Sequence, residues 1–281
     1  MPKNFPKITA SAALFFLCLG FSGLSLAEID QASWNEKKST HFIVYSQEAS
    51  AEYIDEVIRQ AEIYYHSITE ELGFTRFSSF WTWENRTKIY ICDNLAEYRK
   101  RTNQPAWAAS EVNVIKKEML TFVDRDEFFD MILPHELGHI IFREFVGCRR
   151  KLPLWLDEGI ASFLEKKNRN DRLMLAKLSV KMPSFISFDQ LQQTQRVNML
   201  MPQVFYAESA SIINFLLDEY GREKFFDFCH ALQKSRPDQE WTEAFFGVYK
   251  FKDFTDMESK WIAYLLKTPF TKPAELFNKE P

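Results

Sequence analysis

The spacing of hydrophobic positions predicts a strand, a helix and a second strand in the first part of the chain. The run 40–46 is β-branched and aromatic, as in a half-buried strand. Residues 49–72 carry apolar side chains at helical spacing, and Gly73 then favours a helix end. His66 lies on this helix, where we expect a surface or packing residue. Residues 87–92 alternate between polar and apolar side chains, which predicts another strand.

A short helix and a hairpin are predicted next. Asp93 and Asn94 supply a cap for a helix that runs to about Arg101, after which Pro105 prevents helix. Residues 112–115 and 119–123 predict two strands, joined through the charged turn Lys116-Lys117-Glu118. The aromatic segment 77–84 is expected to be a loop or a short strand.

A long helix is predicted over about 127–145, with Asp124 or Asp126 as its cap and Gly147 as its end. Pro134 conflicts with an unbroken helix, because it removes one backbone hydrogen bond and clashes with the preceding turn. We expect either a bend just before His135 or a new helix that starts at Pro134. Under helical periodicity one broad face carries Phe128, Ile132, His135, His139 and Phe142.

The second half of the chain predicts mainly helices. Pro153 opens a helix to about Lys166, while the charges of 165–172 predict a solvated face or loop. Residues 183–188 are expected to form a linker or a lid that lines a cleft. The remaining helices are predicted over 173–178, 204–220 ended by Gly221, 222–234, 241–249 and 257–266, with a loosely held tail from Lys267.

Strands before helices favour an α+β fold, with a small mixed sheet in the N-terminal half packed on a mainly helical C-terminal half. The very start of the chain predicts a secretory signal peptide. Lys3 and Lys7 precede an apolar, small-residue stretch over 8–26, and small residues at 25 and 27 favour cleavage after Ala27. An uncleaved anchor is the alternative, with lipidation at Cys18 a minor one. We therefore expect an exported protein, periplasmic or secreted, that begins at Glu28.

Composition then limits the class of function. Removing 27 residues from 281 leaves 254, which is enough for one catalytic domain, divided here into an α/β lobe over 28–125 and a helical lobe over 126–281. The mature part has 33 basic and 39 acidic residues, so nothing favours nucleic-acid binding. It holds no second long apolar run and is expected to be soluble. Cys92, Cys148 and Cys229 allow one disulfide or none.

The segment His135-Glu136-Leu137-Gly138-His139 carries the candidate chemistry. One helical turn separates His135 from His139, so both imidazoles can reach a single ion, which is a zinc-ligand spacing. Glu136 lies beside them in the position of a general base for water. A catalytic zinc site takes a third protein ligand, and the helix opened by Pro153 can deliver Glu158.

His135, Glu136, His139 and Glu158, the last within Trp155-Leu156-Asp157-Glu158-Gly159-Ile160-Ala161, resemble the gluzincin branch of the zincin metallopeptidases. The resemblance implies Zn²⁺ as cofactor, peptide-bond hydrolysis on a peptide or protein substrate, and a zinc cleft between the two lobes. It places the hairpin of 112–123 beside the metal as an edge for extended substrate. It also implies an oxyanion donor, for which Tyr206 is the candidate and His230 a weaker one.

Two departures from the family pattern qualify this hypothesis. Thermolysin-like enzymes have an aspartate one turn after the glutamate ligand, and Ser162 stands there in this chain, so Asp157 or another carboxylate would have to replace it. The chain lacks the Gly-x-Met-Glu-Asn stretch of aminopeptidase relatives, which favours an endopeptidase. The alternatives are a peptidase-fold binding or assembly factor with little turnover, and a structural zinc protein, which the open ligand set disfavours.

Overall fold

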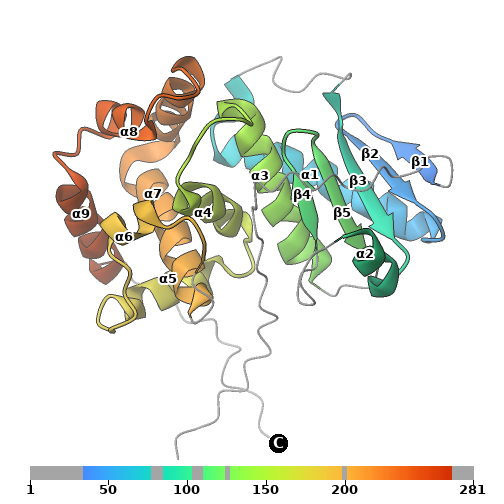
Figure 1. Ribbon diagram of the computed structural model, residues 1–281, viewed down its shortest axis with the longest axis horizontal. Coiled ribbons are helices and arrows are strands. Elements are labelled where there is room, and N and C mark those ends of the chain that lie inside the picture. The colour runs from blue at the N-terminus through green and yellow to red at the C-terminus, as the bar shows by residue number, and fades with distance from the viewer. Residues whose placement is uncertain (1–33, 77–84, 103–109, 124–126, 198–200, 268–281) are drawn as a thin grey trace, which may run out of the picture.

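The computed structural model describes residues 34–76, 85–102, 110–123, 127–197 and 201–267. It has a mixed α+β fold, as the sequence predicts, with a five-stranded sheet in the N-terminal half and helices in the C-terminal half. The sheet and the helical group lie at opposite ends of the molecule, and helix α3 lies between them (Figure 1).

The sheet is mixed and has the strand order β1-β2-β3-β5-β4. Its central strands β2, β3 and β5 are parallel, whereas β1 and β4 pair antiparallel at the two edges. The strands are β1 (Asn35–Lys38), β2 (Phe42–Ser46), β3 (Thr87–Cys92), β4 (Glu111–Asn113) and β5 (Glu118–Phe122). The predicted strands are confirmed, and β1 is an additional strand of exposed polar residues that hydrophobic patterning did not predict.

Alternate side chains of the sheet enter two separate clusters, because successive residues of a strand point to opposite faces. Val44, Ile89 and Met119 join the main core, which includes α1 (Ala51–Glu71) and α3 (Leu133–Val146). The opposite face joins a smaller cluster beneath α2 (Leu95–Arg101), made of Trp34, Tyr45, Tyr90, Cys92, Tyr98, Leu120 and Phe122. The sheet is therefore covered by helices on both faces.

The predicted caps and turns are largely present in this half. Asn94 accepts hydrogen bonds from the backbone N–H groups of Ala96 and Glu97 at 3.0 and 3.1 Å, which starts α2. Gly73 follows α1 with φ 77°, a left-handed conformation that favours glycine. The β4–β5 turn is fixed by Asn113 Oδ1, which accepts hydrogen bonds from the backbone N–H groups of Ile115 and Lys116 at 3.1 and 3.0 Å. Strand β4 lies at one edge of the sheet and contacts α3.

The histidine-bearing helix begins later than the sequence predicts. Phe128–Ile132 form a π-helical turn, and α3 starts at Leu133 with Pro134 in its first turn, where a missing N–H costs little. The new-helix alternative is therefore the better description. A π turn holds more residues than an α turn, so the predicted common face of Phe128 and His135 was based on the wrong period. The expected caps Asp124 and Asp126, like 77–84 and Pro105, lie outside the described residues.

The helical half surrounds α4, whose residues are nearly all buried. Gly221 has a non-helical conformation with φ 83°, so α7 consists of two helices that meet where the sequence predicted a break. The helices are α4 (Leu154–Leu164), α5 (Arg169–Ser179), α6 (Phe188–Gln193), α7 (Pro202–Lys234), α8 (Trp241–Tyr249) and α9 (Phe254–Lys267). Between α5 and α6, Phe185 stacks on Trp261, and Phe188 at the start of α6 packs on Trp155. Residues 183–188 are therefore a connector anchored in the core, and the lid interpretation is not supported.

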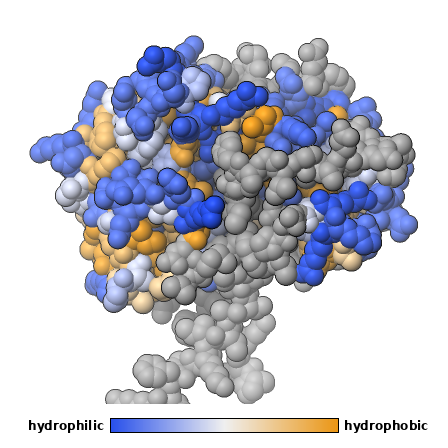
Figure 2. Space-filling model, viewed as in Figure 1, coloured by the Kyte–Doolittle hydropathy of each residue, from blue (hydrophilic) through white to orange (hydrophobic). Residues whose placement is uncertain are grey.

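The surface, the hydropathy of the helices and the cysteines add three findings. Hydrophobic surface gathers on the helical half near α5 and α9, where Leu178, Met182 and Leu266 are exposed (Figure 2). Within the described ranges, no helix combines the length and the apolar character needed to cross a membrane. Cys92, Cys148 and Cys229 are all free thiols, which decides between the two cysteine alternatives.

Candidate metal centre

Two adjacent helices bring His135, His139 and Glu158 together. The Nε2 atoms of the two histidines lie 3.2 Å apart, and Glu158 Oε2 lies 3.7 Å from His135 Nε2 and 3.8 Å from His139 Nε2. Bonds of about 2.0 to 2.2 Å in a tetrahedral site place ligand atoms about 3.3 to 3.6 Å apart. The three atoms therefore need only small movements to bind one ion. We call these residues the metal cluster.

Small residues at the helix contacts allow Glu158 to come this close. A Cβ atom built on Gly138 of α3 would lie 3.3 Å from Ala161 Cα and 2.8 Å from the Leu164 side chain in α4. A Cβ on Gly159 would lie 2.7 Å from the backbone oxygen of Ser209 in α7, a distance that real Cβ atoms essentially never show. Helix α4 thus packs closely against both α3 and α7 through these two glycine contacts.

The Glu158 carboxylate is fully buried, and both of its oxygens accept no hydrogen bond from any residue that the structure describes. Burial raises the pKa of Glu158 to about 7, although His139 and His135 oppose this rise. A buried carboxylate without a hydrogen-bond donor is costly unless a cation balances it. A divalent cation bound between Glu158 and the two imidazoles would remove this cost, so the donor set fits a metal ion.

His139 is oriented from behind by Asp157. Its Nδ1 atom lies 3.3 Å from Asp157 Oδ1, while Asp157 Oδ2 accepts hydrogen bonds from Arg143 Nε at 2.9 Å and Nη2 at 2.7 Å. Burial alone would raise the pKa of Asp157, but Arg143 and His139 hold it below its usual range. A charged carboxylate therefore faces His139 Nδ1 and leaves Nε2 directed at the cluster. The sequence-based suggestion that Asp157 replaces the missing aspartate at Ser162 agrees with this geometry.

His135 has a second carboxylate partner that the sequence did not suggest. Its Nδ1 atom lies 2.8 Å from Glu165 Oε1, and Arg172 Nη2 donates to both oxygens of Glu165 at 2.7 and 2.6 Å. Burial is outweighed by Arg172 and His135, so the pKa of Glu165 falls to about 2. The prediction of a solvated 165–172 segment is therefore wrong at Glu165, which is 3% exposed. Arg172, seven residues further on, was the signal that could have indicated a buried pair.

Glu136 is 1% exposed and lies next to the metal cluster on α3. The hydroxyl of Ser110, the residue before edge strand β4, donates a short hydrogen bond to Glu136 Oε1. The other oxygen, Oε2, accepts no hydrogen bond from the described part of the chain. One oxygen is thus held in place while the second is left as an acceptor, as a base for water requires.

The two candidate oxyanion donors lie in different places. Tyr206 is buried near the start of α7, and Arg172 Cζ lies 5.8 Å from its ring centroid, so it belongs to the same surroundings as Glu165 and His135. His230 stacks on Phe226, which neighbours Phe145 near the C-terminal end of α3. That end is remote from the two histidines of α3, whereas Tyr206 lies near Arg172, which pairs with the Glu165 carboxylate behind His135.

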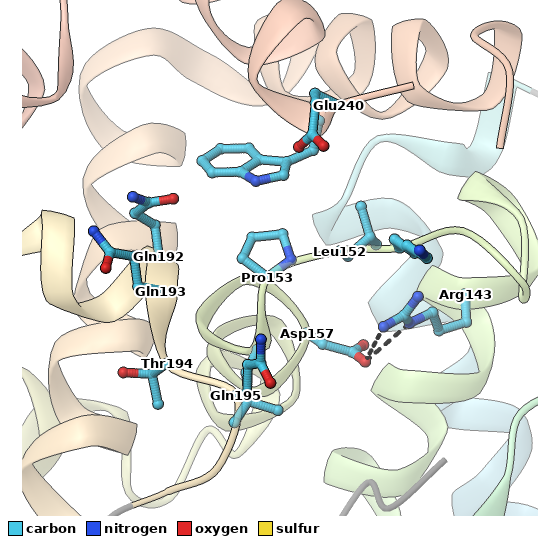
Figure 3. A pocket seen from close by; sticks show the side chains of 12 residues that line it. Arg143, Leu152, Pro153, Asp157, Gln192, Gln193, Thr194, Gln195 and Glu240 are labelled. Atoms are coloured by element: carbon cyan, nitrogen blue, oxygen red, sulfur yellow. Dashed lines mark hydrogen bonds and ion pairs between the residues drawn. The ribbon is translucent and has the colours of Figure 1, made fainter. Parts of the chain in front are cut away.

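A separate pocket of about 600 Å³ opens behind the metal cluster. Asp157 and Arg143 form part of its wall, and their contact is drawn in Figure 3. Trp241 and Glu240 line the side that α8 supplies. The other lining residues are Lys151, Leu152, Pro153, Leu154, Gln192, Gln193, Thr194 and Gln195. The pocket is not lined by His135, His139 or Glu158. It therefore borders the metal cluster only through Asp157 and Arg143, the pair behind His139.

Comparison with known proteins decides the family. The family model described as Peptidase MA superfamily matches residues 108–267, which is more than half of the chain. The chain belongs to the Peptidase MA superfamily. Comparison with curated proteins gives no match. The match starts just before β4 and ends with α9, so it includes the metal cluster, Glu136 and Tyr206.

Membership of the Peptidase MA superfamily makes this a peptidase-like protein and points to peptides or proteins as substrates. The superfamily is typically metal-dependent, and the three ligand atoms of the metal cluster all lie within 4.8 Å of one another. Strands β1 to β3 and helices α1 and α2 precede the matched segment. The sequence-based resemblance is thus confirmed at the level of the superfamily.

Proposed function

We propose that this protein is an exported, zinc-dependent endopeptidase with a zincin-like fold. The observation that carries the proposal is the convergence of His135 Nε2, His139 Nε2 and a Glu158 carboxylate to which no residue of the described ranges donates a hydrogen bond. The family match adds support, since the matched superfamily is typically metal-dependent. The proposed division is a signal peptide over 1–27, an α/β lobe over 28–125 and a helical lobe over 126–281.

In this proposal His135, His139 and Glu158 hold the ion. Zinc bound there supplies a Lewis acid, which lowers the pKa of a water molecule from about 15.7 towards about 7. Glu136 accepts the proton of the attacking water with Oε2 and passes it to the leaving amine, while Ser110 holds Oε1. Tyr206 donates to the oxygen that becomes negative as the carbonyl is attacked.

Substrate would bind in extended form along β4. This strand pairs with β5 on one side and is an edge of the sheet, so its other side offers backbone groups to a peptide. Ser110 connects that edge directly to Glu136. Backbone pairing does not read side chains, which agrees with an endopeptidase that cleaves within a chain.

The decisive test is zinc content and peptide cleavage of purified protein and matched variants. Glu136→Gln should keep zinc but lower turnover by about 10²-fold or more, because the proton acceptor is lost. Glu144→Gln, on the same helix but paired with Lys117, is the control and should keep activity. His139→Ala should lose the ion. Full activity in Glu136→Gln would refute the mechanism.

A peptidase-fold binding factor is the second candidate, because Glu136 alone argues against it. Zinc content of about one per chain without chelator-sensitive cleavage of a broad peptide library would favour that reading. Export is tested separately by mass spectrometry of the mature protein, which should begin at Glu28. A purified protein that still begins at residue 1 would support the uncleaved N-terminal anchor instead.

A further inference from the structure

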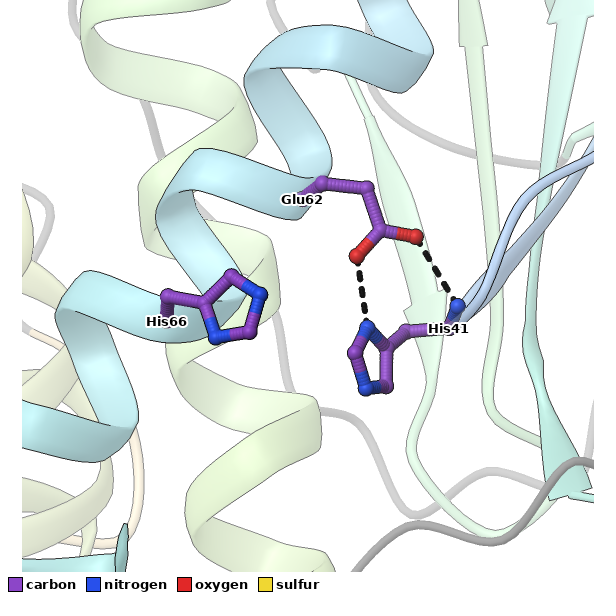
Figure 4. Close-up of side chains that lie close together, drawn as sticks. All are labelled: His41, Glu62 and His66. Carbon is purple, nitrogen blue, oxygen red and sulfur yellow. Dashed lines mark hydrogen bonds and ion pairs between the residues drawn. The ribbon is translucent and has the colours of Figure 1, made fainter.

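The histidines of this chain are grouped in an unusual way. The chain has five, of which His135 and His139 belong to the metal cluster. His41 and His66, 25 residues apart in sequence, also lie side by side, with the Glu62 carboxylate next to His41 (Figure 4). Only His230 belongs to neither group. The second group lies on α1 and at the start of β2, outside the segment matched by the family model.

We propose that His41, Glu62 and His66, the α1 cluster, form a second metal site for a late first-row divalent cation such as Zn²⁺. One ligand atom from each residue lies within 4.8 Å of the other two. Two imidazoles and one carboxylate are the donor set of the metal cluster as well, and this set suits zinc or copper better than calcium or magnesium. The site is independent of the proposed peptidase activity.

Two of the three ligands are already held in place. The His41 ring stacks on Tyr65, with centroids 3.8 Å apart and planes 22° apart. The backbone N–H of His41 donates to Glu62 Oε1 at 2.9 Å, which turns Oε2 towards His41 Nδ1 at 2.5 Å. These contacts hold the Glu62 carboxylate beside the His41 ring. A cation would therefore meet an ordered, anionic pair.

The third ligand, His66, is placed by helix geometry. Glu62 and His66 are separated by one turn of α1, which puts both side chains on one face. The His66 ring stands nearly perpendicular to that of His41, with centroids 5.6 Å apart, and its side chain is exposed. On binding, the His41–Glu62 contact would lengthen and His66 would turn inwards until ligand atoms lie about 3.3 to 3.6 Å apart. An exposed histidine makes that rotation inexpensive.

This site would join β2 to α1. His41 directly precedes β2, whereas Glu62 and His66 lie in the second half of α1, so one ion would connect two elements of the α/β half. Because the cluster is only partly buried, water would complete the coordination. The expected ion is thus a peripheral, stabilising one that is released more readily than the ion of the buried metal cluster.

Zinc titration of chelator-stripped full-length mature protein tests the proposal. We expect about two zinc ions per chain for the unchanged protein, and about one for either His66→Ala or His139→Ala. The double variant should bind none. Adding zinc to His139→Ala should raise its melting temperature by about 2 to 4 °C, and His66→Ala should abolish that rise.

His230→Ala is the matched control, because it removes the histidine that lies outside both clusters, and it should bind as many ions as the unchanged protein. Glu62→Gln, which keeps an acceptor for the His41 N–H, should behave as His66→Ala. The proposal is overturned if His66→Ala binds as much zinc as its parent. If instead the metal cluster does not bind zinc, the unchanged protein binds about one ion, and His139→Ala still binds that ion. Failure of the α1 cluster and failure of the metal cluster therefore give different zinc contents across the variants.

Discussion

At the scale of single residues, each histidine of the metal cluster has its own carboxylate and arginine behind it. Asp157 and Arg143 support His139, while Glu165 and Arg172 support His135. Such partners fix the ring orientation and the nitrogen that faces the ion. The two supports are formed by different segments, one at the start of α4 and one just after its end.

We expect Glu165→Gln to weaken zinc binding by about 10- to 100-fold, because His135 would lose a charged partner. The matched change is Asp157→Asn at the other histidine, with the same expected size. Competition with a calibrated chelator measures both affinities, and circular dichroism checks the fold. Unchanged zinc affinity in a folded Glu165→Gln protein would show that this carboxylate only neutralises Arg172.

Glu208 is a buried acid outside the metal cluster. It accepts hydrogen bonds from Ser179 Oγ at 2.6 Å and from the Ile186 N–H at 3.2 Å, and so ties the connector after α5 to α7. Burial raises the pKa of Glu208 to about 8 against these donors, and nearby Glu258 adds to the rise. The folded protein therefore keeps a proton on Glu208 that the unfolded chain loses near pH 4.5.

The sign of this linkage gives a prediction. Between about pH 4.5 and 8 the folded state binds the extra proton, so this residue's contribution to stability is full below pH 4.5 and falls as the pH rises to about 8. Glu208→Gln carries no such proton, and its unfolding free energy relative to the unchanged protein should rise across this range by up to a few kcal/mol. Urea titrations at several pH values measure the difference. A difference that stays constant with pH would contradict the assignment.

At the scale of elements, the contact of α4 with α7 places Glu158. We expect Gly159→Ala to destabilise the protein by about 1 to 3 kcal/mol, because the new methyl group meets the Ser209 carbonyl. Gly247→Ala in α8 is the control, since no atom of the described residues lies within 4 Å of where its Cβ would be, and it should stabilise by about 0.5 to 1 kcal/mol. Thermal unfolding measures both. A Gly159→Ala protein that is as stable as the unchanged protein would contradict the close contact of α4 with α7.

Helices and strands whose hydrophobic residues recur at regular spacing were predictable from the sequence. Elements that form through contacts with distant parts of the chain were not. Helix α1 and its end at Gly73, or the hairpin around Asn113, follow from local patterns. Strand β1 has no hydrophobic residue, and only its pairing with β2 makes it a strand. The π turn at Phe128–Ile132 likewise leaves no mark in hydrophobic spacing, because it is one irregular turn before a long regular helix.

For the site, spacing along the chain predicted the ligands but not their support. His135 and His139 are one turn apart in any helix, so their meeting was certain once α3 formed. Glu165 reaches His135 only because α4 ends at Leu164 beside α3, and the pairing with Arg172 depends on the following turn. Such long-range juxtapositions have no counterpart in local sequence. The pocket beside Trp241 was unpredictable for the same reason.

At the scale of the whole molecule, the sheet and the helical group meet on α3. Arg150 strengthens this junction, because its guanidinium donates to the Val146 carbonyl at the end of α3 and to the Ser235 and Arg236 carbonyls after α7. Arg150 therefore connects the C-terminal ends of α3 and α7. Two halves joined in this way have one continuous core, which runs from Val44 in the sheet to Trp261 in α9.

The burial of α3 has a consequence for solvent access. Every residue of Leu133–Val146 except Glu144 is buried, so its backbone amides are shielded by the sheet side and by the helices α4 and α7 at once. Amides of this kind exchange with deuterium only when the entire domain opens. The two imidazoles proposed as ligands thus stand on a segment where we expect slow deuterium exchange, and any movement that admits a substrate has to come from the elements around it.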